Sequence, residues 1–198
     1  MARPRSFSSE QVVEAAQGVF WCSGYQQAAI RDLERATRLS RSSLYGAFGT
    51  KKAIFDQALD AYLADFIGSR LAPLERPGAG TGDIERFLAG LAAFFRTDER
   101  AQQGCLMINS IAEHEGRSDH LAGRAQAFRD RLHHALSNAL ASHQPTLATE
   151  RAHLLTATTF GIWLTARIDP ATAADACEAT IASVRTWRRP APRRRRSA

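Results

Sequence analysis

Residues 40–55 read SRSSLYGAFGTKKAIF, and this stretch contains the signals of two helices. Ser40 and Thr50 are both good N-cap residues, because a side-chain oxygen can accept a hydrogen bond from a free N–H of the first helical turn. Each of them precedes apolar residues at helical spacing. Gly49 lies between the two runs and suits a chain reversal after the first helix. The pattern therefore predicts a short helix that ends at Gly49 and a new helix that begins after Thr50.

The sequence before this stretch predicts two further helices. Ser8 is a candidate cap for a first helix that ends at Gly24. A second short helix is expected at about 29–37. Two short helices joined by a tight turn, with a first helix packed against them, form a helix-turn-helix unit. In such a unit Leu44 and Phe48 anchor the helix that begins after Ser40 to the core.

The remaining residues of the opening stretch are suited to DNA. In a helix-turn-helix protein the N-terminal part of the second helix of the pair reaches base edges in the major groove. Arginine and serine side chains can bond to bases there, whereas a tyrosine hydroxyl or a lysine ammonium suits a phosphate. The only two lysines of the chain open the following helix, where free backbone N–H groups also attract anions. The residues predicted to contact DNA are Arg41, Ser42, Ser43, Tyr45, Lys51 and Lys52.

These motifs resemble the N-terminal region of the TetR family of bacterial transcriptional regulators (TetR/AcrR type). The likeness lies in VVEAAQGVFWCSGY followed by IRDLERATRLSRSSLYGAFGTKKAIFDQAL, and it covers about residues 10–60. It implies that Ser42, Ser43 and Tyr45 face the DNA and that Lys51 contacts a phosphate. It further implies a larger C-terminal domain that dimerises and binds a small effector, which releases the DNA.

The chain also departs from the family pattern. Alanines stand at Ala28 and Ala29, where a threonine or serine often caps the second helix, and their presence should weaken that helix start by about 1 kcal/mol. Arg38 replaces the usual glycine of the turn, which costs roughly 1 kcal/mol in a left-handed conformation. An ion pair from Glu34 is expected to offset a few tenths of a kcal/mol. Small side chains at 46–47 suggest that fewer base positions are read directly.

Helical spacing continues through the rest of the chain, and no sustained strand pattern occurs. The fold class expected is all-α, with about nine helices. The domains expected are a helix-turn-helix DNA-binding domain at 1–50, a helical effector-binding and dimerisation domain at 51–187 that includes a connecting helix at 51–66, and a disordered basic tail at 188–198. Within the second domain, helices are expected at about 84–95, 106–115, 121–144, 149–168 and 171–187.

Charge is unevenly distributed along the chain. The overall formal charge is +6, but the tail alone carries six arginines and no acid. Residues 1–60 have a net charge of +2, and residues 61–187 have a net charge of −2. The positive end of the folded part is therefore the DNA-binding end, and the tail is either an accessory phosphate contact or a solubilising appendage. With no signal peptide and no run of 18 apolar residues, we expect a cytoplasmic protein without a membrane partner.

Apolar residues of the second half suggest an effector pocket and a dimer interface. An aromatic, apolar pocket with few fixed charges would suit a hydrophobic or aromatic effector. The residues predicted for it are Phe87, Leu91, Phe94, Phe95, Met107, Ile111, Phe128 and Trp163. Small residues every four positions form a ridge that a second helix can approach closely. The residues predicted for a homodimer interface are Leu132, Ala139, Ala157, Gly161 and Thr165.

No pattern points to catalysis, a cofactor or a metal. The acids and histidines of EHEGRSDH (113–120) do not have the spacing of three ligands on one face of a helix. No nucleophile–base arrangement and no phosphate-binding glycine loop occurs. The leading hypothesis is thus a repressor that a small effector releases from an inverted-repeat, double-stranded operator. The alternatives are a redox-controlled repressor that senses through Cys105, which follows Gly104 at a helix start, or a module of this fold that has lost DNA recognition.

Overall fold

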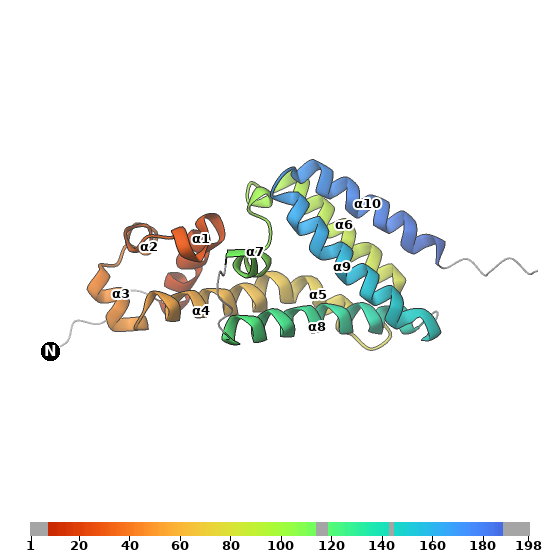
Figure 1. Ribbon diagram of the computed structural model, residues 1–198, viewed down its shortest axis with the longest axis horizontal. Coiled ribbons are helices and arrows are strands. Elements are labelled where there is room, and N and C mark those ends of the chain that lie inside the picture. The colour runs from red at the N-terminus through yellow and green to blue at the C-terminus, as the bar shows by residue number, and fades with distance from the viewer. Residues whose placement is uncertain (1–7, 114–118, 143–144, 188–198) are drawn as a thin grey trace, which may run out of the picture. The chain divides into compact units, whose positions relative to one another are not determined.

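The structure is a computed structural model that describes residues 8–113, 119–142 and 145–187 (Figure 1). Within these ranges helices are the only regular elements. Residues 51–75 form an unbroken helical segment, so that the described ranges contain nine larger helices, as the sequence predicts. No helix in the described ranges has the length and apolar character needed to cross a bilayer. The basic tail at 188–198 lies outside the described residues.

The chain divides into two compact units, and each consists of two segments. The first unit comprises residues 1–70 and 99–130, and the second comprises residues 71–98 and 131–198. This division follows the packing and joins the helix-turn-helix to residues from the middle of the chain. The domains expected from the sequence, with a boundary after residue 50, stay a prediction.

The first unit contains the helix-turn-helix and the elements packed around it. Its elements are α1 (Ser9–Gln27), α2 (Ile30–Thr37), α3 (Arg41–Phe48), α4 (Lys51–Ala61), the π-helical segment η1 (Tyr62–Ile67), the start of α5 (Gly68–Glu75), the 3-10 turn η2 (Ala101–Gln103), α7 (Leu106–Glu113) and the first half of α8 (Asp119–Ala141).

Aromatic rings form part of the core of the first unit. Phe20 of α1 meets Phe55 of α4 edge to face, with ring centroids 5.2 Å apart. Trp21 packs in the same manner on Tyr62, at 5.0 Å. These contacts hold α1 on the long helix that follows α3.

Local capping accounts for the short helices. The Ser40 hydroxyl accepts a hydrogen bond from the Ser43 N–H at 3.2 Å and begins α3. The Thr50 hydroxyl accepts from the Ala53 N–H at 3.1 Å and begins α4. Both caps confirm the sequence prediction. Ser8 does occupy the N-cap position of α1, but its side chain makes no capping bond, so that prediction is wrong.

The second unit is a helical bundle. Its elements are the end of α5, α6 (Thr81–Thr97), the second half of α8, the 3-10 turn η3 (Pro145–Leu147), α9 (Ala148–Ala166) and α10 (Pro170–Thr186). Helix α10 packs along α6, and Figure 1 shows α9 beside both. Arg96 of α6 pairs with Asp175 and Glu178 of α10 at 3.1 and 2.5 Å. The helices expected in this half of the chain are therefore all present.

Candidate nucleic-acid interface

The first turn of α3 presents a cluster of exposed polar side chains. Arg41, Ser42 and Ser43 are all exposed. The Ser40 hydroxyl lies 2.9 Å from that of Ser42 and 3.0 Å from that of Ser43, so that one cap oxygen organises both serines. Leu44 is fully buried on the opposite face. The helix is thus held by its apolar face while its polar first turn stays free for a ligand.

Tyr45 lies at the edge of this cluster. Its side chain is half-buried, and the Arg41 guanidinium lies over its ring, 5.4 Å from the centroid. A cation above an aromatic face is attracted by the ring quadrupole. The ring therefore restricts the Arg41 side chain within the single chain.

Glu34 of α2 has a role that the sequence did not indicate. Its carboxylate accepts a hydrogen bond from the Arg41 N–H at 2.6 Å, and so it caps α3 from the preceding helix. This contact replaces the expected ion pair with Arg38. Arg38 itself adopts the left-handed conformation that the turn requires, with φ 58° and ψ 25°. The turn therefore forms without a glycine, and the backbone strain falls on Arg38.

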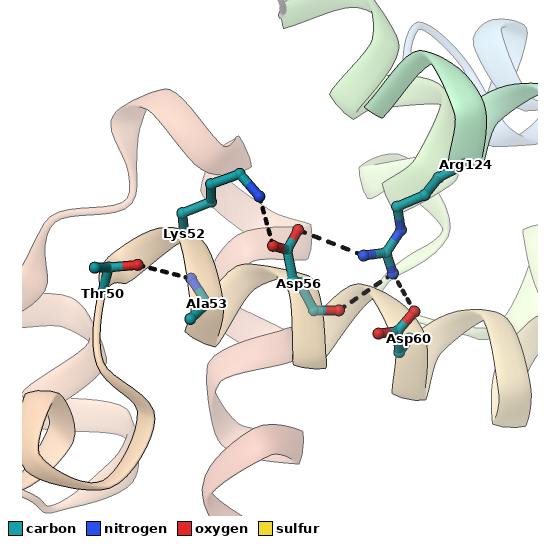
Figure 2. A network of polar contacts seen from close by, with 6 residues as sticks. All are labelled: Thr50, Lys52, Ala53, Asp56, Asp60 and Arg124. Atoms are coloured by element: carbon teal, nitrogen blue, oxygen red, sulfur yellow. Dashed lines mark hydrogen bonds and ion pairs between the residues drawn. The ribbon is translucent and has the colours of Figure 1, made fainter. Parts of the chain in front are cut away.

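The two lysines at the start of α4 occupy different surroundings. The Lys51 ammonium lies 4.7 Å from the centroid of the Tyr25 ring and 3.4 Å from the Gln26 carbonyl oxygen, to which it donates. Partial burial lowers the pKa of Lys51 from its usual value, and the nearby Glu113 carboxylate acts in the opposite direction. Lys52 is more exposed and pairs with Asp56, one turn along the helix, at 2.7 Å (Figure 2). Lys51 thus packs against the end of α1, whereas Lys52 pairs with a carboxylate of its own helix.

The junction between α1 and α2 depends on a glycine. Gly24 has φ 73° and ψ 171°, a conformation that L-residues with a side chain rarely adopt, and it interrupts the helical geometry of α1. The Glu113 carboxylate of α7 fills the space beside it and accepts from the Gln26 N–H at 3.4 Å. At the start of α2, Asp32 accepts from the Ala29 N–H at 3.3 Å and supplies half of a capping box. The Ala29 methyl group cannot supply the other half.

Cys105 is buried at the start of α7. Its side chain is 0% exposed, and burial raises the pKa of its thiol more than the Tyr62 hydroxyl and the N–H groups of Ile108 and Met107 lower it. A buried thiol with a raised pKa has little thiolate at neutral pH and reacts slowly. Cys177 is buried as well, and burial raises its pKa to about 12, whereas Cys22 is exposed. The histidines and acids at 114–120 fall outside the described side chains.

The residues predicted for an effector pocket are divided between the two units. In the second unit Phe94, Phe95 and Trp163 pack together, and the Phe95 and Trp163 centroids are 4.9 Å apart. Two further predicted residues lie in α6: Leu91 is buried, and Phe87 is half-buried. The three members in the first unit are Met107 and Phe128, which are buried, and Ile111, which is 41% exposed. A shared effector cavity therefore remains a prediction.

A cleft of about 920 Å³ lies elsewhere in the first unit, and none of the predicted pocket residues lines it. It is bordered by carboxylates, two arginines and one aromatic ring. Its lining residues are Ser9, Glu10, Val13, Glu14, Gln17, Gln57, Asp60, Ala61, Asp65, Phe66, Ser69, Arg70 and Arg100. This mixture of charges differs from the apolar lining expected for a hydrophobic effector.

The residues predicted for a dimer interface also separate into two groups. Leu132 and Ala139 of α8 are 2% and 0% exposed, so their side chains are covered within the protomer. Ala157 and Gly161 of α9 are exposed, and Thr165 is half-buried. A Cβ atom built on Gly161 would meet no atom within 4 Å. The α9 ridge is therefore open in the single chain, whereas the α8 residues belong to its core.

Comparisons with known proteins agree with this geometry. Residues 12–58 match the family model of the bacterial regulatory proteins of the tetR family. YezE of Bacillus subtilis, an uncharacterized HTH-type transcriptional regulator, is 31% identical over 144 residues, which cover 70% of this chain and 73% of YezE. The HTH-type transcriptional repressor ComR of Escherichia coli is 31% identical over 110 residues. These cover 54% of this chain and about half, 51%, of ComR.

Solved structures of the same fold include a complex with DNA. A cysteine mutant of the TetR family transcriptional regulator CifR, bound to 26-bp double-strand operator DNA, is 25% identical with a TM-score of 0.73, over 92% of this chain and 99% of that one. A TetR transcriptional regulator from Chloroflexus aurantiacus is also 25% identical, with a TM-score of 0.72, over 90% of this chain and 92% of that one. The helix-turn-helix, its polar first turn and these matches define a helix-turn-helix transcriptional regulator. The chain belongs to the TetR family of bacterial transcriptional regulators.

Proposed function

We propose that this regulator is a homodimeric repressor that binds an inverted-repeat operator and is released by a small effector. The observation that carries the DNA-binding part is the polar first turn of α3 directly before the paired lysines of α4. Arg41, Ser42 and Ser43 are exposed while Leu44 anchors the helix in the core. Similar proteins are named repressors, and one similar structure holds operator DNA, which supports this proposal for the present chain.

An exposed apolar stripe along α9 supports the dimer. Leu154, Leu164 and Ile168 are 57%, 49% and 84% exposed, which is unusual for large apolar side chains on one helix and its end. Leu147, Leu154, Gly161 and Ile168 recur every seven residues, with Ala157 and Leu164 between them. This is the repeat of a helix that packs lengthwise against another helix. We therefore place the self-complementary contact of the dimer on α9.

The test of the proposed function is a binding series on DNA taken from beside the protein's own gene. Lys51→Ala should weaken binding to operator and random DNA about equally and reduce the salt slope by about one, because it removes a phosphate contact. Arg41→Ala should instead reduce the preference for the operator by about 1–3 kcal/mol, since it removes a base contact. No bound species at low salt with the wild-type protein would favour the alternative in which this fold has lost DNA recognition.

A further inference from the structure

Asp56 of α4 is shared by two cations from different parts of the chain (Figure 2). On one side the Lys52 ammonium lies 2.7 Å from its Oδ2 atom. On the other side the Arg124 guanidinium of α8 lies 3.4 Å from its Oδ1 atom and donates to the Asp56 backbone carbonyl oxygen at 3.2 Å. Arg124 also donates to Asp60, one turn further along α4. One carboxylate thus links a lysine of the DNA-binding end to an arginine from the middle of the chain.

The two cations differ in how freely they can leave. The Arg124 side chain is only 15% exposed and is held at three acceptor atoms. The Lys52 side chain is 54% exposed and pairs with the Asp56 carboxylate. A pair whose lysine is this exposed is weak and exchanges readily, because water competes for the ammonium. Lys52 is therefore the member of the network that can transfer to another anion.

The position of Lys52 suits it to exchange the Asp56 carboxylate for a DNA phosphate. Lys52 is the second residue of α4, where the helix dipole and the free N–H groups favour negative charge. A carboxylate four residues away opposes that effect unless its own charge is compensated. Arg124 supplies this compensation through contacts to both the side chain and the backbone of Asp56.

We propose that Arg124 is a positioning residue for DNA binding: by holding Asp56, it leaves Lys52 available to a DNA phosphate. This inference rests on the proposed function, and it adds a route by which α8 sets the affinity of the DNA-binding end. When Arg124 is in place, Asp56 keeps this cation after Lys52 leaves. When Arg124 is withdrawn or removed, Asp56 retains Lys52, and one phosphate contact is lost.

The experiment measures binding of the full chain to operator and to random DNA over a salt series. Arg124→Gln should weaken binding to both DNAs alike, by about threefold to tenfold near 0.1 M salt, and reduce the salt slope by about one. In the Lys52→Ala background the same substitution should have no further effect on the slope. An unchanged slope in Arg124→Gln, or an equal fall with and without Lys52, would overturn the proposal.

We call the proposed Arg124–Asp56–Lys52 network the relay. Matched variants distinguish its effect from a general loss of positive charge and from unfolding. Arg129→Gln removes the same charge from α8, but Arg129 pairs with its own neighbour Asp130 at 2.6 Å, so the slope should stay at the wild-type value. Asp56→Asn should restore binding when combined with Arg124→Gln, whereas Asp60→Asn should not, because only Asp56 contacts Lys52.

Two further outcomes are distinguishable from these. If Arg124→Gln does not fold, Asp56→Asn alone decides: it should bind DNA at least as tightly as the wild type, and tightening that persists in Lys52→Ala would contradict the relay. If the wild-type chain binds no DNA, the proposed function fails. A wild-type chain that binds while Arg124→Gln behaves identically overturns the relay alone.

Discussion

The indole N–H of Trp21 donates a buried hydrogen bond of 2.9 Å to the carbonyl oxygen of Gly104, 83 residues along the chain. Trp21 lies in α1, and Gly104 directly precedes Cys105 at the start of α7. The bond therefore ties the first helix of the helix-turn-helix to the segment that carries the buried thiol. A buried carbonyl group left without its donor costs free energy, because water cannot replace the lost partner.

Replacing Trp21 by phenylalanine should show how much this hydrogen bond contributes to the free energy of unfolding. Trp21→Phe leaves the Gly104 carbonyl unpaired, and the free energy of unfolding should fall by about 1–3 kcal/mol. Urea unfolding followed by circular dichroism measures the change. Trp187→Phe is the control, since Trp187 is half-exposed at the end of α10 and should lose no more than about 0.5 kcal/mol. Equal losses at both positions would show that the buried bond contributes nothing.

The two glycines of α1 should respond in opposite directions to the same substitution. Gly24→Ala places a Cβ atom against the Glu113 carboxylate and forces a side chain into a left-handed backbone, so we expect a loss of about 1–3 kcal/mol. Gly18→Ala meets no atom within 4 Å in a regular, exposed part of the helix and should gain about 0.5–1 kcal/mol.

Thermal unfolding of both variants by circular dichroism provides the measurement. Adding Glu113→Ala to Gly24→Ala should recover the part of the lost stability that the steric clash causes. The part that the backbone strain causes should remain. A Gly24→Ala protein as stable as Gly18→Ala would mean that the junction between α1 and α2 does not need its glycine.

Local features of this fold could be predicted from the sequence, whereas contacts between distant residues could not. Ser40 and Thr50 each cap a helix with an N–H three residues away, so the signal and its partner lie in one short stretch. Glu34 caps α3 across a turn, seven residues before Arg41, and the sequence suggested a different partner. Arg124 has no local signal at all, because its carboxylates lie more than 60 residues earlier.

The candidate interfaces show the same limit. Apolar periodicity indicates that one face of α8 is covered, but it does not say by what. Leu132 and Ala139 are covered within the protomer, whereas the α9 ridge at Ala157 and Gly161 is open. The two helices have similar patterns in the sequence, and only the packing of the chain distinguishes them.

Thiol chemistry should separate the three cysteines. Burial raises the pKa values of Cys105 and Cys177, so at neutral pH both should stay protonated and react slowly with iodoacetamide. The exposed Cys22 should react faster than either, because the reagent can reach its sulfur directly. Alkylation of Cys105 and Cys177 should accelerate only at a pH above the usual range for thiols, because a raised pKa keeps a thiol neutral to higher pH. Peptide mapping by mass spectrometry gives the three rates.

This measurement also decides between two forms of regulation. Slow alkylation of Cys105 in the folded protein, with rapid alkylation in urea, is the expected result. Alkylation of Cys105 at pH 7 as fast as that of Cys22, together with loss of DNA binding in the modified protein, would instead support the redox-controlled repressor.

The exposed stripe of α9 gives the last prediction, which concerns the dimer. Leu164 is 49% exposed in the single chain, so a charged side chain should be tolerated there by the protomer. In a symmetric interface Leu164→Glu removes two apolar contacts and buries two carboxylates, each lost leucine contact being worth about 1.5–3 kcal/mol when fully buried. Sedimentation should therefore give the monomer mass of 21.7 kDa for Leu164→Glu and twice that mass for the wild type.

Ala89→Glu is the matched control, because Ala89 is an exposed position of a different helix, α6. It should leave the dimer intact. Since a dimer spaces two recognition helices about 34–36 Å apart, one DNA turn, the Leu164→Glu monomer should engage one half-site at a time and bind an inverted repeat poorly. Its helical content should remain that of the wild type. A folded Leu164→Glu protein that still sediments as a dimer would place the contact between protomers on a surface other than α9.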